Sequence, residues 1–186
     1  MLTKTQTAGS LTLEGVRPRL NAAMRACVCW AVIEEHDKVL GMACGDGRLL
    51  MHLNDQLRLT LCGMCGQAEQ ARMVSELLGG ADVVPGRMED IPWRCDTFDE
   101  VLLSRAIKGD PRRVLDEAVR VLRPGGQFVM AAPLLPVKME GELSRREMMR
   151  LMQEAGFREV SFRAAGFSGA LVGWKPGPVD AVKKRA

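Results

Sequence analysis

The residues whose types and spacing suggest ligand binding lie in the stretch Gly41–Gly47, which reads Gly-Met-Ala-Cys-Gly-Asp-Gly. The apolar residues Val39 and Leu40 precede this stretch, and the apolar pair Leu49 and Leu50 follows it. The pattern predicts a strand, a tight glycine turn and the start of a helix. Glycine lets the backbone turn sharply and lets a ligand approach the main chain. In α/β sheets such a turn after the first strand binds nucleotide-like ligands, so we expect a ligand site here.

A second group with chemical potential is the Cys-x-x-Cys pair, Cys62 and Cys65, placed where a predicted strand meets a helix. A thiol at a helix N-terminus has a lowered pKa and is more reactive, so this pair could act as a redox centre. A metal site would need two further ligands, and no second Cys-x-x-Cys pair stands at zinc spacing. The chain has six cysteines and no evident export signal, which favours reduced, structural thiols. We expect no metal, and the redox pair stays open as an alternative.

Length and composition favour a single domain over residues 1–186, with 47% hydrophobic and 26% charged residues as in ordinary globular proteins. Residues 1–15 predict a loose N-terminal arm, and residues 176–186 predict a frayed basic tail. The net charge of +3 is mild and does not favour a nucleic-acid partner. No apolar run approaches the ~18 residues of a membrane span, and the first residues lack the apolar region of a signal peptide. We therefore expect a cytoplasmic protein with no membrane association.

The glycine turn and the cysteine pair need a framework of strands and helices, which the apolar periodicity predicts. After the first strand, six further strands are expected at Leu57–Met64, Ala81–Pro85, Phe98–Ser104, Gln127–Ala132, Glu159–Ala164 and Ser168–Trp174. Helices are expected over about Pro18–Glu35, Arg48–Asp55, Gly66–Leu78, Pro111–Leu122 and Leu143–Ala155. Ser144 and Glu147 have the spacing of a capping box at the start of the last helix. Strands that alternate with helices predict a mostly parallel sheet covered on both faces.

Two further segments carry the most specific pattern in the chain. The run Ile91–Val101 contains Phe-Asp-Glu-Val, and the run Asp116–Val129 contains Arg-Val-Leu-Arg-Pro-Gly-Gly. Together with the glycine turn, these runs resemble the class I S-adenosylmethionine-dependent methyltransferases, in particular the small type 11 group. The resemblance covers about Val39–Ala132. It implies a Rossmann-like class I methyltransferase fold, which is an α/β fold with a mostly parallel seven-stranded sheet and helices on both faces.

The resemblance also implies S-adenosylmethionine as cofactor, S-adenosylhomocysteine as product, and a set of residues that bind them. Gly41 stands where the family has an acidic residue ahead of the turn. Cys62 stands where the family's ribose-binding acid ends the second strand, and Arg87 stands where an acid faces the adenine. The implied cofactor-binding residues are Gly41, Ala43, Cys44, Gly45, Asp46, Gly47, Cys62, Gly63, Arg87, Met88, Glu89 and Ser104. Since a charge-assisted hydrogen bond contributes ~1.5–3 kcal/mol, cofactor binding should be weak unless Asp46 or Glu89 substitutes.

Other positions bear on the reaction. Ala43 matches the first glycine of the family's turn, and alanine is a mild change if the backbone there is extended. Arg105 and Lys108, after the fourth predicted strand, could steer an acidic substrate. Methyl transfer can proceed by positioning the nucleophile in line, without a general base, so no catalytic residue is assigned.

These observations favour an S-adenosylmethionine-dependent methyltransferase with an atypical cofactor pocket, acting on a small molecule or a protein that the sequence does not identify. The alternative is a catalytically inactive protein of the same fold that serves as a binding or scaffold partner. A weaker alternative is a thiol-redox or metal-binding protein that acts through Cys62 and Cys65. The short link Pro133–Glu142 leaves little chain for a substrate lid. That would suit a large substrate, a homodimer whose second subunit closes the site, or a site without substrate.

Overall fold

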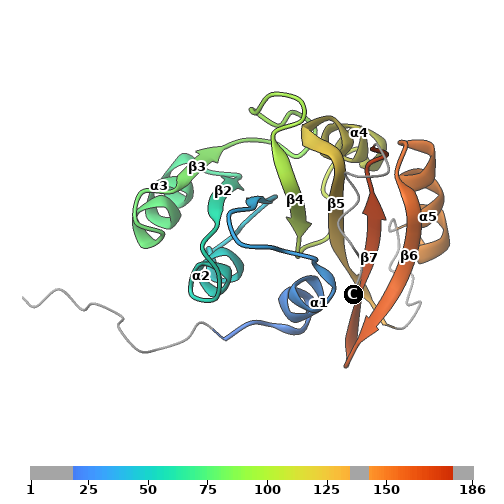
Figure 1. Ribbon diagram of the computed structural model, residues 1–186, viewed down its shortest axis with the longest axis horizontal. Helices are drawn as coiled ribbons and strands as arrows, with labels where there is room; N and C mark the ends of the chain where they lie inside the picture. The colour runs from blue at the N-terminus through green and yellow to red at the C-terminus, as the bar shows by residue number, and fades with distance from the viewer. Residues whose placement is uncertain (1–18, 135–142, 178–186) are drawn as a thin grey trace, which may run out of the picture.

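The computed structural model describes residues 19–134 and 143–177, which contain a seven-stranded sheet (Figure 1). The strands are β1 (Lys38–Gly41), β2 (Thr60–Cys65), β3 (Asp82–Pro85), β4 (Phe98–Leu103), β5 (Leu122–Pro133), β6 (Arg158–Ala165) and β7 (Ser168–Trp174). Their order across the sheet is β3-β2-β1-β4-β5-β7-β6. Neighbouring strands are parallel except β7, which runs antiparallel to β5 and β6. The predicted seven-stranded, mostly parallel sheet is confirmed.

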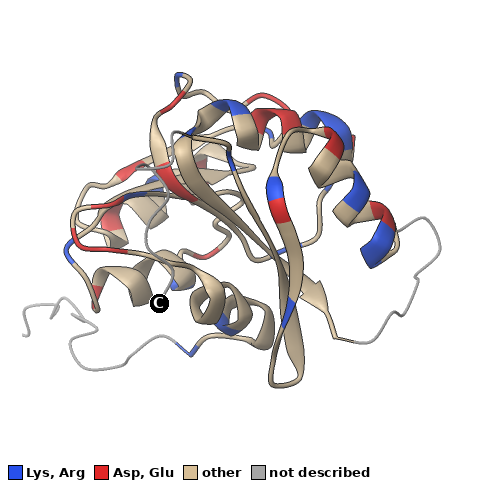
Figure 2. Cartoon of the chain, turned by 45° about the vertical axis from the view of Figure 1, so that its right-hand side comes forward, with Lys and Arg blue, Asp and Glu red and all other residues tan. Residues whose placement is uncertain are grey.

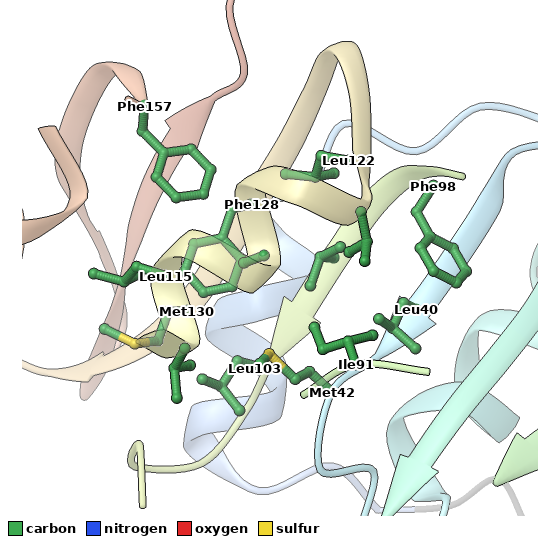
Figure 3. Close-up of a cluster of buried hydrophobic side chains, with 14 of the residues drawn as sticks. Leu40, Met42, Ile91, Phe98, Leu103, Leu115, Leu122, Phe128, Met130 and Phe157 are labelled. Carbon is green, nitrogen blue, oxygen red and sulfur yellow. The ribbon is translucent and has the colours of Figure 1, made fainter. Parts of the chain in front are cut away.

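Helices cover both faces of the sheet. They are α1 (Ala22–Trp30), α2 (Arg48–Asn54), α3 (Ala68–Leu77), α4 (Pro111–Val121) and α5 (Arg145–Glu154). Helices α1, α2 and α3 contribute to one buried cluster, together with Val39 and Leu102 of the sheet. Helices α4 and α5 contribute to a second cluster, together with Leu40, Val101 and Phe128 (Figure 3). Since successive strand residues point to opposite faces, these two clusters are the cores on the two sides of the sheet.

The strand register brings four strand ends together at one edge of the sheet. Gly41, the last residue of β1, is level with Gly63 of β2 and with Leu102 of β4. Cys65, the last residue of β2, is level with Pro85, the last residue of β3. The carboxyl ends of β1 to β4 therefore meet at the edge where open α/β sheets bind ligands.

Helix α1 is shorter than the helix predicted over Pro18–Glu35. Its first turn is capped by Asn21, whose side chain accepts a hydrogen bond from the Met24 N–H, and the chain leaves the helix at Ala31 with an extended backbone. A side-chain cap of this kind fixes where a helix begins. At the start of α5, the capping box predicted for Ser144 and Glu147 is confirmed by both of its hydrogen bonds.

Strand β5 is longer than the predicted strand Gln127–Ala132. It begins at Leu122, which pairs with Phe98 of β4, and the register then shifts before Gln127 pairs with Glu100. The Arg-Pro-Gly-Gly run, which the sequence suggested as a helix stop and turn, lies in this irregular part of the strand. Extra residues in one strand of a pair form a bulge, so the run re-aims the chain while pairing continues.

Charged residues of both signs are spread over helices and loops, whereas the central strands carry few (Figure 2). No helix within residues 19–134 and 143–177 is long and apolar enough to cross a membrane. The arm predicted for residues 1–15, most of the tail 176–186 and most of the link Pro133–Glu142 lie outside the described residues.

Candidate functional site

A pocket of about 290 Å³ lies at the edge where the carboxyl ends of β1 to β4 meet. Its lining consists of Ala43 after β1, Met64, Cys65 and Gly66 at the end of β2, Gly86, Arg87, Met88 and Glu89 after β3, and Lys108 and Gly109 after β4. Gly66 leaves open space, because a Cβ added there would meet no other atom within 4 Å. The position of this pocket is the one at which α/β sheets bind ligands, so we treat it as the candidate site.

The glycine turn that follows β1 forms one side of the site. Three of its residues have positive φ: Ala43 at 56°, Gly45 at 61° and Gly47 at 77°. The N–H of Cys44 donates to the carbonyl of Met64 at 2.9 Å, which holds the turn beside the end of β2. A left-handed conformation costs a non-glycine residue roughly 1–2 kcal/mol. The condition under which alanine would be a mild change at residue 43, an extended backbone, is therefore not met.

Gly41 lies buried at the end of β1 and does not line the pocket. A Cβ built on it would lie 2.9–3.0 Å from three carbons of the Leu50 side chain, which comes from α2. Leu50 therefore fills the space that an acidic side chain at residue 41 would enter. The space next to the last residue of β1 is thus occupied by an apolar side chain.

Asp46, proposed from the sequence as a substitute carboxylate, does not line the pocket. Its Oδ2 accepts a hydrogen bond from Nε of Arg48 at 2.6 Å, and both side chains are about half exposed. Asp46 is therefore engaged at the surface of the turn.

The placement of Cys62 at the end of the second strand is wrong, because β2 extends to Cys65. Cys62 lies within the strand among the side chains under α4 and α5, and burial raises the pKa of its thiol to about 11. Cys65 faces the other side of the sheet and lines the pocket. The residue at the end of β2, the position that the resemblance assigns to a ribose-binding acid, is Cys65. Gly63 is likewise buried within the strand.

The structure does not bring together the thiol pair Cys62 and Cys65 of the weaker alternative, since the two residues point to opposite faces of the sheet. The sulfur close to Cys65 is that of Cys44, with the Sγ atoms 2.7 Å apart and both side chains buried. Burial and the hydrogen bond with Cys65 raise the pKa of Cys44 above its ordinary range. Within the described residues, no group of three or more His, Cys, Asp or Glu side chains could hold a metal ion.

Glu89 is the carboxylate of the pocket lining. Its side chain is 13% exposed, and its Oε2 lies 3.7 Å from Nε of Arg87, whose side chain is 80% exposed. A hydrogen bond from its own N–H, the charge of Arg87 and a hydrogen bond from the Asp110 N–H hold the pKa of Glu89 below its ordinary value. Glu89 is therefore ionised at neutral pH. Gly109, with a φ of 93°, lies against this carboxylate, and a Cβ built on it would collide with Oε1 of Glu89.

Two cations lie near the pocket without an ion pair to any described residue: Arg105 and Lys108. Lys108 lines the pocket. Nη1 of Arg105 lies 3.3 Å from the position that a Cβ on Gly45 would take, so this guanidinium lies against the glycine turn. Arg87, Arg105 and Lys108 are three cations in or near the pocket, whereas Glu89 is the carboxylate of its lining. The net charge of these four side chains is therefore positive.

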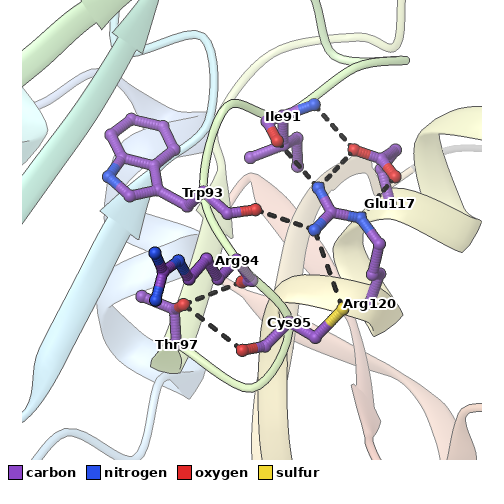
Figure 4. Close-up of polar contacts among 7 residues, drawn as sticks. All are labelled: Ile91, Trp93, Arg94, Cys95, Thr97, Glu117 and Arg120. Carbon is purple, nitrogen blue, oxygen red and sulfur yellow. Dashed lines mark hydrogen bonds and ion pairs between the residues drawn. The ribbon is translucent and has the colours of Figure 1, made fainter.

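The loop after Glu89 is fixed to α4 by Arg120 and Glu117 (Figure 4). Arg120 donates to the carbonyls of Ile91 and Trp93, each at 2.7 Å. Glu117 accepts the Ile91 N–H at 2.7 Å and forms an ion pair with Arg120 at 2.6 Å. The hydrogen bond from Arg120 holds the pKa of Glu117 below its ordinary value. This network fixes the chain that leads from the pocket into β4.

The pocket brings together four of the predicted cofactor residues, which are Ala43, Arg87, Met88 and Glu89. The predicted residues that do not line it are Gly41, Cys44, Gly45, Asp46, Gly47, Cys62, Gly63 and Ser104. Ser104 is buried directly after β4. The lining residues outside the predicted cofactor set are Met64, Cys65, Gly66, Gly86, Lys108 and Gly109. Of these, the sequence had indicated Lys108 as a substrate-steering cation and Cys65 as part of a thiol pair, whereas the other four were missed. Gly66 and Gly86 each directly follow a strand, which is the signal that could have indicated them.

Comparison with known proteins places this geometry in context. Residues 40–130 match the family model described as a methyltransferase domain. The 2-methyl-6-phytyl-1,4-hydroquinone methyltransferase 2 of rice chloroplasts (Oryza sativa subsp. japonica) is 32% identical over 111 residues, which cover 54% of this chain and 32% of that protein. The chain thus matches about a third of the length of this relative.

Solved structures share the fold. A chain from the complex between the Haloferax volcanii Trm112 methyltransferase activator and a methyltransferase aligns with a TM-score of 0.66 at 20% identity, covering 81% of this chain and 87% of that one. The [4+2]-cyclase SpnF aligns with a TM-score of 0.71 at 14% identity, covering 83% and 80%. The chain has the Rossmann-like class I methyltransferase fold, and the match over residues 40–130 confirms its resemblance to the S-adenosylmethionine-dependent methyltransferases of the type 11 group.

Proposed function

We propose that this chain is an S-adenosylmethionine-dependent methyltransferase with an atypical pocket, in which Glu89 is the main acidic contact for the cofactor. The observation that supports this proposal most strongly is the position of the Glu89 carboxylate, ionised and largely enclosed in a pocket at the carboxyl ends of β1 to β4. An ionised carboxylate accepts strong, charge-assisted hydrogen bonds from hydroxyl and amino groups.

The residues of the pocket fit part of the chemistry of the cofactor. Gly66 leaves open space beside the end of β2, and Met64 and Met88 offer polarisable, apolar surface to an adenine ring. Glu89 would accept hydrogen bonds from the nucleoside, and its negative charge would favour a cationic ligand. These contacts support binding without the acids that the family has at the positions of Gly41 and Arg87.

When bound, the cofactor supplies an electrophilic methyl group. The chain would hold the acceptor in line with that group and keep water out, which is sufficient for transfer to a reactive nucleophile. Lys108 in the pocket lining and Arg105 against the glycine turn form no ion pair with a described residue, and their charges favour an acceptor that carries an acidic group. A carboxylate or phosphate on the acceptor would be drawn to them without having to displace an existing ion pair.

A second candidate function is that of a binding protein without methyltransferase activity. It is supported by Leu50, which fills the space of one family acid, and by Cys65, which stands in place of another. The fold does not decide between the two candidates, because folds of this kind host many reactions.

Calorimetric titration of the purified, reduced protein with S-adenosylhomocysteine and S-adenosylmethionine tests the proposal. We expect binding, and we expect Glu89→Gln to weaken it about tenfold or more, since a lost charge-assisted hydrogen bond costs ~1.5–3 kcal/mol. The control Asp90→Asn changes a neighbouring exposed carboxylate outside the pocket lining. This variant should bind both ligands with the same affinity as the wild type. Absence of heat up to millimolar ligand would contradict the proposal and favour the binding protein.

A further inference from the structure

Cys44 and Cys65 bring two sulfur atoms together at the side of the pocket. Their Sγ atoms are 2.7 Å apart, although the residues are separated by 21 positions in the sequence. Both are free thiols, and both side chains are buried. All of the chain's cysteines lie within residues 19–134, and the other four have no sulfur at hydrogen-bonding distance.

The backbone holds the two thiols in this arrangement. Cys44 lies in the turn after β1, and its N–H donates to the carbonyl of Met64, the residue before Cys65. The Cys65 thiol also donates a weak hydrogen bond to the carbonyl of Gly45, with a sulfur–oxygen distance of 3.7 Å. The turn and the end of β2 are thus attached to each other on both sides of the sulfur pair. An S–S bond is ~2.04 Å long, so the sulfurs have to approach by only about 0.7 Å.

We propose that Cys44 and Cys65 form a reversible disulfide at the wall of the pocket, with a peroxide as the oxidant. This inference is independent of the proposed function, because it needs no cofactor or methyl acceptor. It replaces the Cys62 and Cys65 pair, which the sheet separates, with a pair that the fold joins.

The reaction balances in two steps. The Cys65 sulfur, which faces the pocket, attacks one oxygen of hydrogen peroxide, so that an S–O bond forms, the O–O bond breaks and the leaving hydroxide takes up the thiol proton as water. The Cys44 sulfur then attacks the sulfenic sulfur of Cys65, so that the S–S bond forms and the S–O bond breaks. The second hydroxide leaves with the Cys44 proton as a second water. The two thiols lose two electrons and two protons, and the peroxide is reduced to two waters.

The pocket gives a small oxidant access to the buried pair. Cys65 contributes to the lining of a pocket of about 290 Å³, which is large compared with the space that a water-sized molecule needs. Oxidation removes the S–H group that Cys65 donates to Gly45, so it alters the hydrogen bonding of the glycine turn. It also links the turn covalently to β2.

The test is oxidation of the folded, full-length protein with a small molar excess of hydrogen peroxide. Remaining thiols are then alkylated, the protein is digested, and linked peptides are mapped by mass spectrometry. We expect one predominant link, between the peptides that contain Cys44 and Cys65, which disappears after dithiothreitol. Closing a loop of this length should also raise the midpoint of thermal unfolding by about 5 °C or more, and dithiothreitol should reverse that rise.

Matched variants separate this pair from the other cysteines. Cys44→Ser and Cys65→Ser should each abolish both the link and the rise in the midpoint. Cys62→Ser, which removes another buried thiol of the same strand, should retain both. Six alkylated cysteines after peroxide treatment, a predominant link between any other pair, or a fall of the midpoint on oxidation would each overturn the proposal.

Discussion

The side chain of Leu50 lies directly against the backbone of Gly41, so that a Cβ built on Gly41 would be 2.9 Å from Cδ2 of Leu50. Leu50 is fully buried between α2 and the sheet, and Gly41 is the last residue of β1. A small residue on the strand and a large one on the helix therefore complement each other. Because Leu50 occupies this space, a larger side chain at residue 41, including an acidic one, would collide with it.

This relationship predicts that Gly41→Ala destabilises the protein by about 1–3 kcal/mol, because the added methyl group overpacks the contact. Leu50→Ala should cost about 2–5 kcal/mol through loss of a buried side chain. In the double variant the new methyl group points into the space that Leu50 vacates. We therefore expect the double variant to lose less than the sum of the single losses, with a coupling of about 0.5–3 kcal/mol. Urea unfolding measures all four free energies.

Gly66→Ala is the control for this cycle. A Cβ at Gly66 meets no atom within 4 Å, so we expect a change within about 0.5 kcal/mol. Strict additivity of Gly41→Ala and Leu50→Ala would show that the two residues do not share the space that the structure gives them.

Ala43 provides a second prediction, since its φ of 56° is one that glycine adopts without strain. Ala43→Gly should relieve roughly 1–2 kcal/mol of strain while the unfolded chain gains entropy worth ~0.4–1 kcal/mol. We expect a result between no change and a gain of about 1.6 kcal/mol of stability. Ala118→Gly, in the buried interior of α4, should instead lose about 1 kcal/mol. A comparable loss at both positions in thermal unfolding would contradict the strained conformation of Ala43.

The fold could be predicted from the sequence because its signals are local. Apolar runs that alternate with capped helices indicated where along the chain the strands lie. The spacing of Ser144 and Glu147 marked the start of α5 correctly. The position of the ribose-binding acid was misplaced at Cys62 because it was counted back from a helix, and the predicted strand Leu57–Met64 stopped one residue before the end of β2. Strand ends depend on pairing, and here pairing of Cys65 with Pro85 extends β2 beyond the predicted end.

The candidate site was harder to predict because its contacts join distant parts of the chain. The positive φ of Ala43 and the position of Leu50 against Gly41 depend on how the turn and α2 pack on the sheet. The proximity of Cys44 to Cys65 follows from the parallel register in which Gly41 is level with Gly63. Spacing within one segment carries no information about such a register.

Arg120 offers a test of how the loop after the pocket is held. It donates to the carbonyls of Ile91 and Trp93 and pairs with Glu117. Arg120→Met should therefore destabilise the protein by about 2 kcal/mol or more, because hydrogen bonds to a charged group are lost and their partners remain. Arg150→Met removes an exposed guanidinium whose ion pair with Glu154 is 3.6 Å long, and should cost less than about 0.5 kcal/mol. Equal effects of both changes on urea unfolding would mean that the loop does not depend on Arg120.

The lowered pKa of Glu117 predicts a pH dependence of stability. A carboxyl whose pKa is lower in the folded state stabilises that state at any pH above its ordinary value of 4.5, and this contribution is lost as the pH falls through the lowered pKa. The difference in unfolding free energy between wild type and Glu117→Gln should thus be constant near neutral pH. It should shrink as the pH falls below 4.5, the ordinary pKa of a glutamate carboxyl. Unfolding series from neutral pH to about pH 3 measure it. A difference that grows as the pH falls would have the wrong sign.

The environments of the cysteines predict which thiols react in the folded protein. Burial raises the pKa of Cys27 to about 12 and that of Cys62 to about 11, so both remain protonated at neutral pH and are weak nucleophiles. Cys29 and Cys95 are exposed. During a short iodoacetamide pulse at neutral pH, we therefore expect Cys29 and Cys95 to be labelled, and Cys27 and Cys62 to be labelled only after urea is added. Peptide mapping reads out each site separately. Early labelling of Cys62 would mean that β2 opens to solvent, and would make Cys62 accessible for the redox role that its burial now opposes.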